Sequence, residues 1–327
     1  MSERFLGLDL LRAILMFLGI PYHTGLIFSG NWIYVSQFDR VNWIFFPALI
    51  PHSFRMQIFF LIAGFFTALL IDRKSFNQFI ESRLYKIIIP FMIFYFIFDI
   101  ILIIISNNEP ILNWQSAFFG HFWFIYSLMI FYFLVCIFRK KILELNFFKI
   151  LLISFIFIFF GSFIPEGYLL NTLKFSPFFL LGCLFYNRIE EIKLYKNQYF
   201  ILLFLFCFSS LLSFYFYIYQ KDLDYYQYIE NFLFITTSLP ACFLIFFSFK
   251  SLKINSNKYL ETLIKSSFTI YIIHMPLVVL WSVILDNYIF SPIYYFISIV
   301  IMTTLSSFFI YFLLKANKST AKILALR

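Results

Sequence analysis

The stretch LDLLRAILMFLGIPYHTGLIFS, residues 8–29, decides what class of protein this is. Asp9 and Arg12 are its only charged residues, and about 20 mainly apolar residues suffice to cross a bilayer as a helix. A cleaved signal peptide has a shorter apolar core that ends at a small-residue cleavage site. No A-x-A site follows this stretch, so the sequence predicts a retained membrane-spanning helix.

Apolar segments of similar length recur along the whole chain. Apolar residues make up 62% of the 327 residues and charged residues 13%, whereas soluble domains have about half and about a quarter. The apolar residues suffice for about ten spans. Long unbroken apolar runs exclude disorder and argue against a β-barrel, whose strands alternate apolar with polar residues. We therefore predict an all-α polytopic membrane protein, a bundle of about 10 transmembrane helices in a single domain, 1–327. The spans are approximately 8–29, 44–71, 87–105, 117–138, 148–165, 169–187, 199–219, 229–249, 267–286 and 292–314.

The positions of the basic residues predict how the spans are oriented. If the N-terminus is cytoplasmic, the inner segments carry 20 Lys and Arg residues and the outer segments only 3. Cytoplasmic loops have this excess in membrane proteins, so both termini are predicted to be cytoplasmic. The net charge of +9 follows from this bias, and nucleic-acid binding is not needed to explain it. The four cysteines lie in apolar runs without C-x-x-C spacing, so we expect no metal site.

Arg12 and His23 are polar residues within the first predicted span. Eleven residues at 100° each complete about three turns, so the two side chains share a face, about 16 Å apart along the axis. Asp9 lies three residues before Arg12 and can pair with it. Ionisable residues inside a span are costly and mark a cavity or a partner. This face therefore predicts a functional site, although Arg12 alone could also extend to the membrane surface.

All four histidines lie in or at the ends of predicted spans, and the polar residues fall into two layers. His52 and Arg55 are three residues apart and share a helix face, and His121 could belong with Trp123 to an interfacial aromatic belt. The layers suggest a site reached from both faces, with a cationic mouth on the cytoplasmic side. The outer layer is His23, His52, Arg55 and His121, and the inner layer is Asp9, Arg12, His274, Arg83 and Lys86.

The spacing of Arg12 and His23 resembles the R-x10-H signature of the membrane acyltransferase-3 family. Further segments resemble the motifs of that family in the same order, and the resemblance covers most of the chain. It is strongest to the glucan biosynthesis protein C branch, although the chain is shorter than that branch and Ala63 replaces the usual Ser before Gly64. The segments are PHSFRMQIFFLIAGFF (51–66), ESRLYKIIIP (81–90, with Lys86 where Arg is commoner), HFWFIYSLM (121–129), SPFFLLG (176–182) and SSFTIYIIHMPL (266–277).

The resemblance implies transfer of an acyl group from cytoplasmic acyl-CoA to a sugar hydroxyl outside the bacterial inner (cytoplasmic) membrane. The branch implies succinyl-CoA as the donor, and the wider family implies acetyl-CoA. The acceptor could be a periplasmic glucan, another polysaccharide or a lipid-linked sugar. The expected partners are therefore acyl-CoA, a glycan and the lipid bilayer, and the oligomeric state stays open.

The same residues supply candidates for the chemistry of acyl transfer. Histidine has an ordinary pKa near 6.5 and can accept a hydroxyl proton, and we expect His23 to be this base. Arg55 and His121 are candidate donors to the tetrahedral oxyanion. His274 either binds the thioester end of the donor or holds its own span in place. With Arg12, these residues form the candidate catalytic set.

Basic and aromatic residues supply candidates for substrate binding. Coenzyme A carries several phosphates, and guanidinium groups suit contacts with oxyanions. Arg12, Arg83 and Lys86 are expected to hold these phosphates, with ordinary positive-inside charge as the alternative for Arg83 and Lys86. The candidate substrate contacts are His52, Arg55 and Trp123.

Two alternatives remain open. The sequence has no G-x-S-x-G motif and no cysteine near a histidine, so direct transfer is favoured over a covalent acyl-enzyme. A secondary transporter or flippase would also place His and Arg within spans. Such proteins often show an internal repeat, which this sequence lacks.

Overall fold

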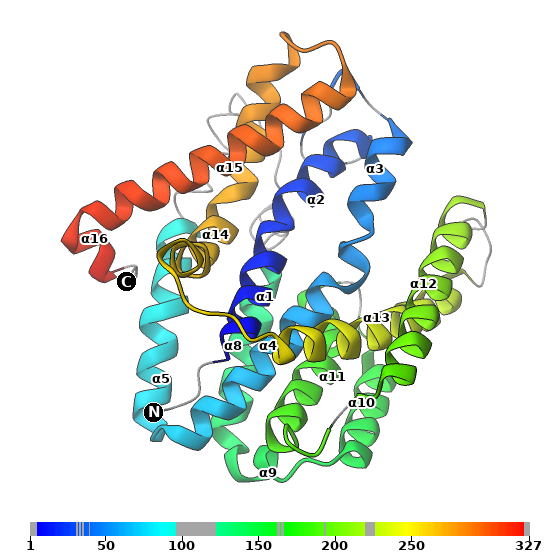
Figure 1. Cartoon of the computed structure of the whole chain (residues 1–327), viewed down its shortest axis with the longest axis vertical. Coiled ribbons are helices and arrows are strands. Elements are labelled where there is room, and N and C mark those ends of the chain that lie inside the picture. The colour runs from blue at the N-terminus through cyan, green and yellow to red at the C-terminus, as the bar shows by residue number, and fades with distance from the viewer. Residues whose placement is uncertain are drawn as a thin grey trace.

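The protein is helical throughout the part of the chain that the structure describes. This computed structural model describes residues 5–30, 32, 34, 36–38, 40–95, 122–161, 164, 167–192, 194–219 and 226–323. No strand occurs among these residues, and the helices lie together in a bundle (Figure 1).

The helices include two short non-α turns, the 3₁₀ turn η1 (Ile27–Ser29) and the π-helical turn η2 (Leu84–Ile88). In chain order the α-helices are α1 (Leu6–Phe17), α2 (Gly19–Leu26), α3 (Asn42–Leu49), α4 (His52–Arg73), α5 (Phe76–Arg83), α8 (Trp123–Ile137), α9 (Arg139–Leu143), α10 (Phe147–Gly161), α11 (Tyr168–Asn187), α12 (Lys196–Tyr219), α13 (Tyr226–Ser251), α14 (Lys258–Asp286), α15 (Pro292–Ala316) and α16 (Lys318–Ile323).

Seven helical segments are long and apolar enough to cross a membrane, and each overlaps a span predicted from the sequence. The polytopic α-helical class is therefore confirmed. The segments are Leu6–Ser29, Asn42–Arg73, Leu169–Asn187, Lys196–Phe216, Phe232–Ser251, Lys258–Asp286 and Pro292–Ala316.

The other three predicted spans are not matched by a helix of that length in the described part of the chain. α8 and α10 have 15 residues each. They are therefore about 22 Å long, against about 30 Å of hydrocarbon. The predicted span 87–105 is described only as far as residue 95, and residues 117–121 also lie outside the described residues. The count of about ten spans stays a prediction.

Breaks near proline divide two of the spans into shorter helices. Leu18 joins α1 to α2 with a ψ of −11°. Pro21 follows in the first turn of α2, where it lacks the N–H that would bond to the carbonyl four residues earlier. The second span divides in the same way between α3 and α4, next to Pro51. The interval from Arg12 to His23 therefore crosses a joint between two helices, not the single regular helix that the sequence arithmetic assumed.

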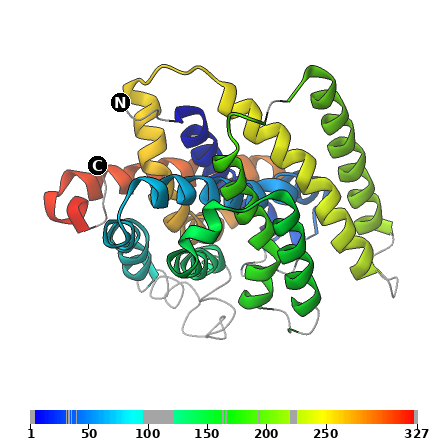
Figure 2. The ribbon, with the colours of Figure 1, turned by 90° about the horizontal axis from the view of Figure 1, so that it is seen from below.

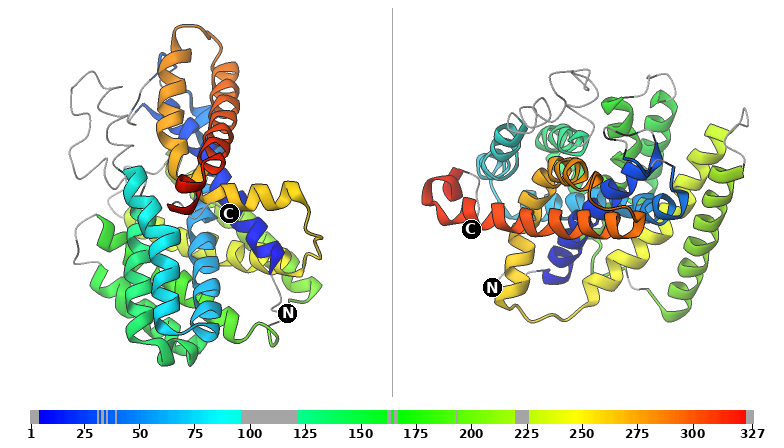
Figure 3. Two further views of the ribbon diagram at one scale, coloured as in Figure 1. Left: turned by 90° about the vertical axis from the view of Figure 1, so that its left-hand side faces the viewer. Right: turned by 90° about the horizontal axis from the view of Figure 1, so that it is seen from above.

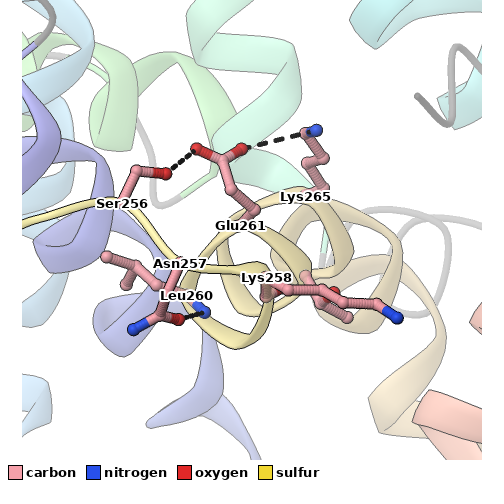
Figure 4. Close-up of polar contacts among 7 residues, drawn as sticks. Ser256, Asn257, Lys258, Leu260, Glu261 and Lys265 are labelled. Atoms are coloured by element: carbon pink, nitrogen blue, oxygen red, sulfur yellow. Dashed lines mark hydrogen bonds and ion pairs between the residues drawn. The ribbon is translucent and has the colours of Figure 1, made fainter.

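α14 begins nine residues before the span predicted at 267–286, because polar residues stabilise its first turns (Figure 4). The Asn257 side chain caps the helix by accepting a hydrogen bond of 2.9 Å from the backbone N–H of Leu260. Ser256 donates to Glu261 at 2.7 Å, and Glu261 pairs with Lys265 at 3.4 Å. A search for apolar residues misses this polar beginning.

The early start of α14 changes the predicted position of His274. This residue lies about 24 Å along the helix from its first residue, so it is in the middle of α14. The prediction that His274 belongs to an inner layer, apart from His23, is wrong: the two imidazole rings are 5.2 Å apart.

α4 and α11 form a close helix pair at the centre of the bundle. A Cβ atom added to Gly64 would lie 1.9 Å from the carbonyl oxygen of Phe179, and one added to Gly182 would lie 1.9 Å from that of Leu61. Small residues allow membrane helices to approach in this way. The contact holds α4 in place, whereas α12 packs on α13 at the edge of the molecule (Figure 2).

Polar contacts join the loops at each end of the bundle. At one end, Arg139 donates to the carbonyl of Lys74 at 2.7 Å, and Lys250 donates to a carbonyl in the turn between α11 and α12 at 2.6 Å. At the other end, Tyr34 donates to Asp286 at 2.8 Å, where α14 meets α15 (Figure 3). Loops predicted to lie on the same side of the membrane are therefore in contact.

Candidate functional site

Three helices bring His23, Arg55 and His274 together inside the bundle. His23 lies on α2, Arg55 on the first turn of α4 and His274 in the middle of α14. Their exposed fractions are 8%, 6% and 1%. A buried group of two imidazoles and a guanidinium is unusual in an apolar bundle, because burying polar groups is costly. This group is the candidate site.

Gly19 marks the point at which the polar atoms converge. A Cβ atom on Gly19 would lie 2.7 Å from Nε2 of His274 and 3.3 Å from an NH1 nitrogen of Arg55. The two nitrogens are therefore at most about 6 Å apart, the sum of these distances. The absence of a side chain on Gly19 allows both groups to approach α2. Sequence reasoning did not select this glycine.

The backbone contacts of His274 fix which of its nitrogens carries the proton. Nδ1 lies 2.6 Å from the carbonyl oxygen of Tyr271 and 3.1 Å from that of Ile270. A carbonyl only accepts hydrogen bonds, so we assign the proton of the neutral ring to Nδ1. Nε2 then has the lone pair, and this nitrogen is the one that faces Gly19.

Arg55 presents a buried hydrogen-bond donor to the same region. Its guanidinium carbon lies 4.8 Å from the centre of the Tyr22 ring, at a cation–π distance. Its NH1 nitrogen is buried and has no hydrogen-bond partner among the described residues. An unsatisfied buried donor is costly. The nitrogen is therefore suited to an oxygen that a bound substrate or a reaction intermediate supplies.

Aromatic rings surround His23. Tyr22 lies edge-on at 4.9 Å, and Trp32 stacks on the His23 ring at 5.7 Å with 27° between the planes. Tyr22 in turn stacks on His52 at 4.4 Å. His52 itself is exposed. Sequence reasoning selected His52 but missed Tyr22 and Trp32. The direct adjacency of Tyr22 to His23 was the only signal for either.

Trp123 connects to the site through a row of aromatic contacts. It begins α8 beside Phe124, which contacts Tyr271 at 6.0 Å, and Tyr271 contacts His274 at 5.9 Å. Trp123 itself packs at 5.0 Å on Phe175. It is therefore near the cluster but not in contact with its polar atoms through these rings. The other candidate of this region, His121, lies outside the described residues.

Arg12 lies nearer the N-terminal end of the first span and has its own partners. It pairs with Asp9 at 3.3 Å, as the sequence predicted, and its guanidinium carbon is 5.7 Å from the Phe66 ring. Its side chain is 35% exposed. Arg12 is therefore accessible, and it is separated along the chain from the buried cluster by the joint at Leu18.

Arg83 and Lys86 lie on and just after α5. The guanidinium of Arg83 lies over Tyr132 at 5.5 Å, and Lys86 is exposed within the π-helical turn η2. Pro90 follows this turn and cannot donate a backbone hydrogen bond to the preceding turn. The wider π-helical turn accommodates this missing bond. Arg83 contacts Phe79 and Tyr132, whereas Arg12 contacts Asp9 and Phe66, so these two predicted phosphate contacts do not share a neighbour among these groups.

The described residues contain no group of three or more His, Cys, Asp or Glu side chains that could hold a metal ion.

Comparisons with known proteins identify the family. The family model described as "Acyltransferase domain" matches residues 5–312. Glucans biosynthesis protein C from Escherichia coli strain K12 is 36% identical over 91 residues, which are 28% of this chain and 24% of the relative. The same protein from Escherichia coli O1:K1 matches to the same extent. The matched part thus spans about a quarter of these relatives, and no solved structure matches. The chain therefore belongs to the acyltransferase-3 family, and part of it is related to glucans biosynthesis protein C.

Proposed function

We propose that this protein transfers an acyl group from cytoplasmic acyl-CoA to a hydroxyl of a glycan outside the bacterial inner membrane, with His23 as the general base. The name of the relatives supports a glucan as the acceptor. The charge bias of the loops supports a cytoplasmic basic end. Succinyl-CoA and acetyl-CoA are the two donors to test.

One observation carries this proposal. The buried NH1 donor of Arg55 and the Nε2 lone pair of His274 meet at Gly19, beside the ring of His23. Acyl transfer to a hydroxyl requires a proton acceptor for the hydroxyl and a donor for the oxyanion. The cluster supplies both within one buried region, where electrostatic interactions are strong because water is excluded.

Each of these residues has its own role in a direct transfer of the acyl group. The acceptor oxygen attacks the thioester carbonyl carbon while His23 takes the hydroxyl proton. NH1 of Arg55 donates a hydrogen bond to the oxyanion, with His121 as a second donor. The carbon–sulfur bond then breaks, and protonated His23 returns the proton to the departing thiolate. Nε2 of His274 accepts a hydrogen bond from protonated His23, which stabilises that intermediate.

The donor is proposed to enter from the basic end of the bundle. Arg12, Arg83 and Lys86 bind its phosphates there, since each is at least partly accessible. Arg12 must then share its guanidinium between Asp9 and a phosphate, which its planar set of five N–H donors allows. At the opposite end, exposed His52 and nearby Trp123 contact the acceptor.

The test uses purified protein in proteoliposomes, supplied with succinyl-CoA or acetyl-CoA and a glucan oligosaccharide. Release of the free thiol measures consumption of the donor, and the mass of the oligosaccharide shows which acyl group it gained. Loss of a base is expected to lower the rate about 10²–10⁴-fold, so His23→Ala should nearly abolish transfer. Loss of the oxyanion donor in Arg55→Gln should lower it about 10²–10³-fold.

Arg188→Gln is the matched control for Arg55→Gln. Arg188 pairs with Glu191 on the surface, and its replacement should leave the rate unchanged. Full activity of His23→Ala at normal protein levels would contradict the assignment of the base. If the protein moves a solute across the liposome membrane and consumes neither acyl-CoA, it is a transporter and the proposed function is wrong.

A further inference from the structure

The proposed reaction has a competitor that the site must exclude. Water can attack the thioester carbonyl in place of the sugar hydroxyl. His23 would take a proton from water, the carbon–sulfur bond would break, and the proton would pass to the thiolate, giving a free acid and coenzyme A. Water is small and abundant, so an enzyme that transfers acyl groups to a hydroxyl must keep water from its base.

Three rings lie close to the ring of His23, which is buried. Tyr22 lies at 4.9 Å and His274 at 5.2 Å, and Trp32 stacks on the ring at 5.7 Å. Tyr22 and His274 belong to membrane-spanning helices. Trp32 does not: it follows η1 and Gly30, whose φ of 81° turns the chain at the end of the first span. Trp32 is therefore the covering ring that comes from a connecting segment.

Hydrogen bonds attach the segment that carries Trp32 to the C-terminal end of α14 and the turn that follows it. Two residues after Trp32, the Tyr34 hydroxyl donates to Asp286 Oδ2 at 2.8 Å. The backbone N–H of Gln37 donates to Oδ1 of the same carboxylate at 3.3 Å, and the Gln37 side chain donates to the carbonyl of Ile289 at 3.2 Å. Asp286 thus holds the segment at two points.

The hydrogen bond from Tyr34 persists over the pH range in which such an enzyme works. Burial, and then the hydrogen bond to Asp286, raise the pKa of the Tyr34 hydroxyl above its ordinary value. The phenol therefore keeps its proton, and can donate it, at neutral and moderately alkaline pH.

We propose that Trp32 is a positioning residue that covers His23 against water, so that the acyl group passes to the glycan and not to water, and that Asp286 holds Trp32 in this place. This inference rests on the proposed function. It concerns the ratio of hydrolysis to transfer, not the presence of either reaction. The indole leaves the edge of the imidazole to the acceptor, because it lies against the ring face.

The first experiment measures both products of the same reaction. Thiol release without acceptor gives hydrolysis, and acylated oligosaccharide gives transfer. Trp32→Ala should raise the ratio of hydrolysis to transfer about tenfold or more, because water then reaches the base. Trp32→Phe keeps an aromatic ring against His23 and should give a smaller rise than Trp32→Ala. Trp43→Ala is the matched control, since Trp43 on α3 is 59% exposed, and it should leave the ratio unchanged.

The second experiment tests the role of Asp286 from a distance. Asp286 is twelve residues beyond His274, about 18 Å along the helix, so it does not touch the reacting atoms. Asp286→Ala removes both hydrogen bonds of the carboxylate and should raise the same ratio in the same direction. A merely structural effect would lower hydrolysis and transfer together and leave the ratio unchanged.

The outcomes separate this inference from the proposed function. If the wild-type protein transfers acyl groups and Trp32→Ala folds with an unchanged ratio, the role of Trp32 is wrong and the proposed function stands. If Trp32→Ala does not fold, the ratios of Trp32→Phe and Asp286→Ala decide, and wild-type ratios for both would overturn the inference. If the wild-type protein consumes neither acyl-CoA, the proposed function itself fails.

Discussion

Replacing Gly19 with alanine places a methyl group at the point where the polar atoms of the site converge. The new Cβ would lie 2.7 Å from Nε2 of His274, whereas ordinary contacts begin near 3.4 Å, so one of the two must move by about 0.7 Å. His274 cannot easily swing away, because it is 1% exposed and its Nδ1 is held by carbonyls of its own helix. A misplacement of about 1 Å can cost about 10²-fold in rate. We therefore expect Gly19→Ala to lower kcat/KM about 10- to 100-fold.

The same substitution should change stability only slightly. Forcing a methyl group into a packed region costs about 1–3 kcal/mol. Alanine is favoured over glycine in a helix by about 1 kcal/mol, and Gly19 does not have the positive φ that would strain alanine. The net loss is therefore about 0–2 kcal/mol. Thermal unfolding in detergent measures it, and thiol release measures kcat/KM on the same preparation.

Gly64→Ala is the matched control for this experiment. Its Cβ would lie 1.9 Å from the backbone oxygen of Phe179, so it separates α4 from α11 and should reduce the unfolding temperature more than Gly19→Ala does. Wild-type kcat/KM in a correctly folded Gly19→Ala protein would refute the reasoning, because the crowded atoms would then have no part in catalysis.

Three further predictions concern Arg55, two buried hydroxyls and the orientation of the protein in the membrane. Arg55→Lys keeps the charge but loses the planar fork, so kcat should fall about 10²-fold with an unchanged unfolding temperature. A rate close to wild type would show that charge alone suffices. Thr303 and Ser307 have buried hydroxyls without a hydrogen-bond partner among the described residues. Thr303→Val and Ser307→Ala should therefore leave the free energy of unfolding unchanged or raise it by about 1 kcal/mol each. A clear decrease in that free energy would show that the hydroxyl does make a hydrogen bond. A cysteine at Tyr288 should react with a membrane-impermeant maleimide from the periplasmic side, and one at Tyr259 only in everted vesicles. Both positions are highly exposed, and the reverse pattern would overturn the predicted orientation.

Much of the fold was readable from local properties of the sequence. The seven spans follow from runs of about 20 apolar residues, and the Asp9–Arg12 pair follows from the spacing of helical residues. Helix ends were less predictable. α14 begins with capping and ion-pair residues that an apolar count ignores, and the first span breaks next to Pro21.

The sequence by itself determined that this is a helical membrane protein and that a few histidines and arginines must avoid lipid, because transfer of each residue into a bilayer depends on that residue and its immediate neighbours. The tertiary structure alone decided which of them meet. His274 joins His23 and Arg55 because α14 packs on α2 and the Arg55 side chain of α4 lies at the same point, Gly19. Trp32 covers His23 because Asp286 on the same distant helix holds its segment. Such contacts depend on how helices far apart in the chain pack against one another, and no local pattern carries that information.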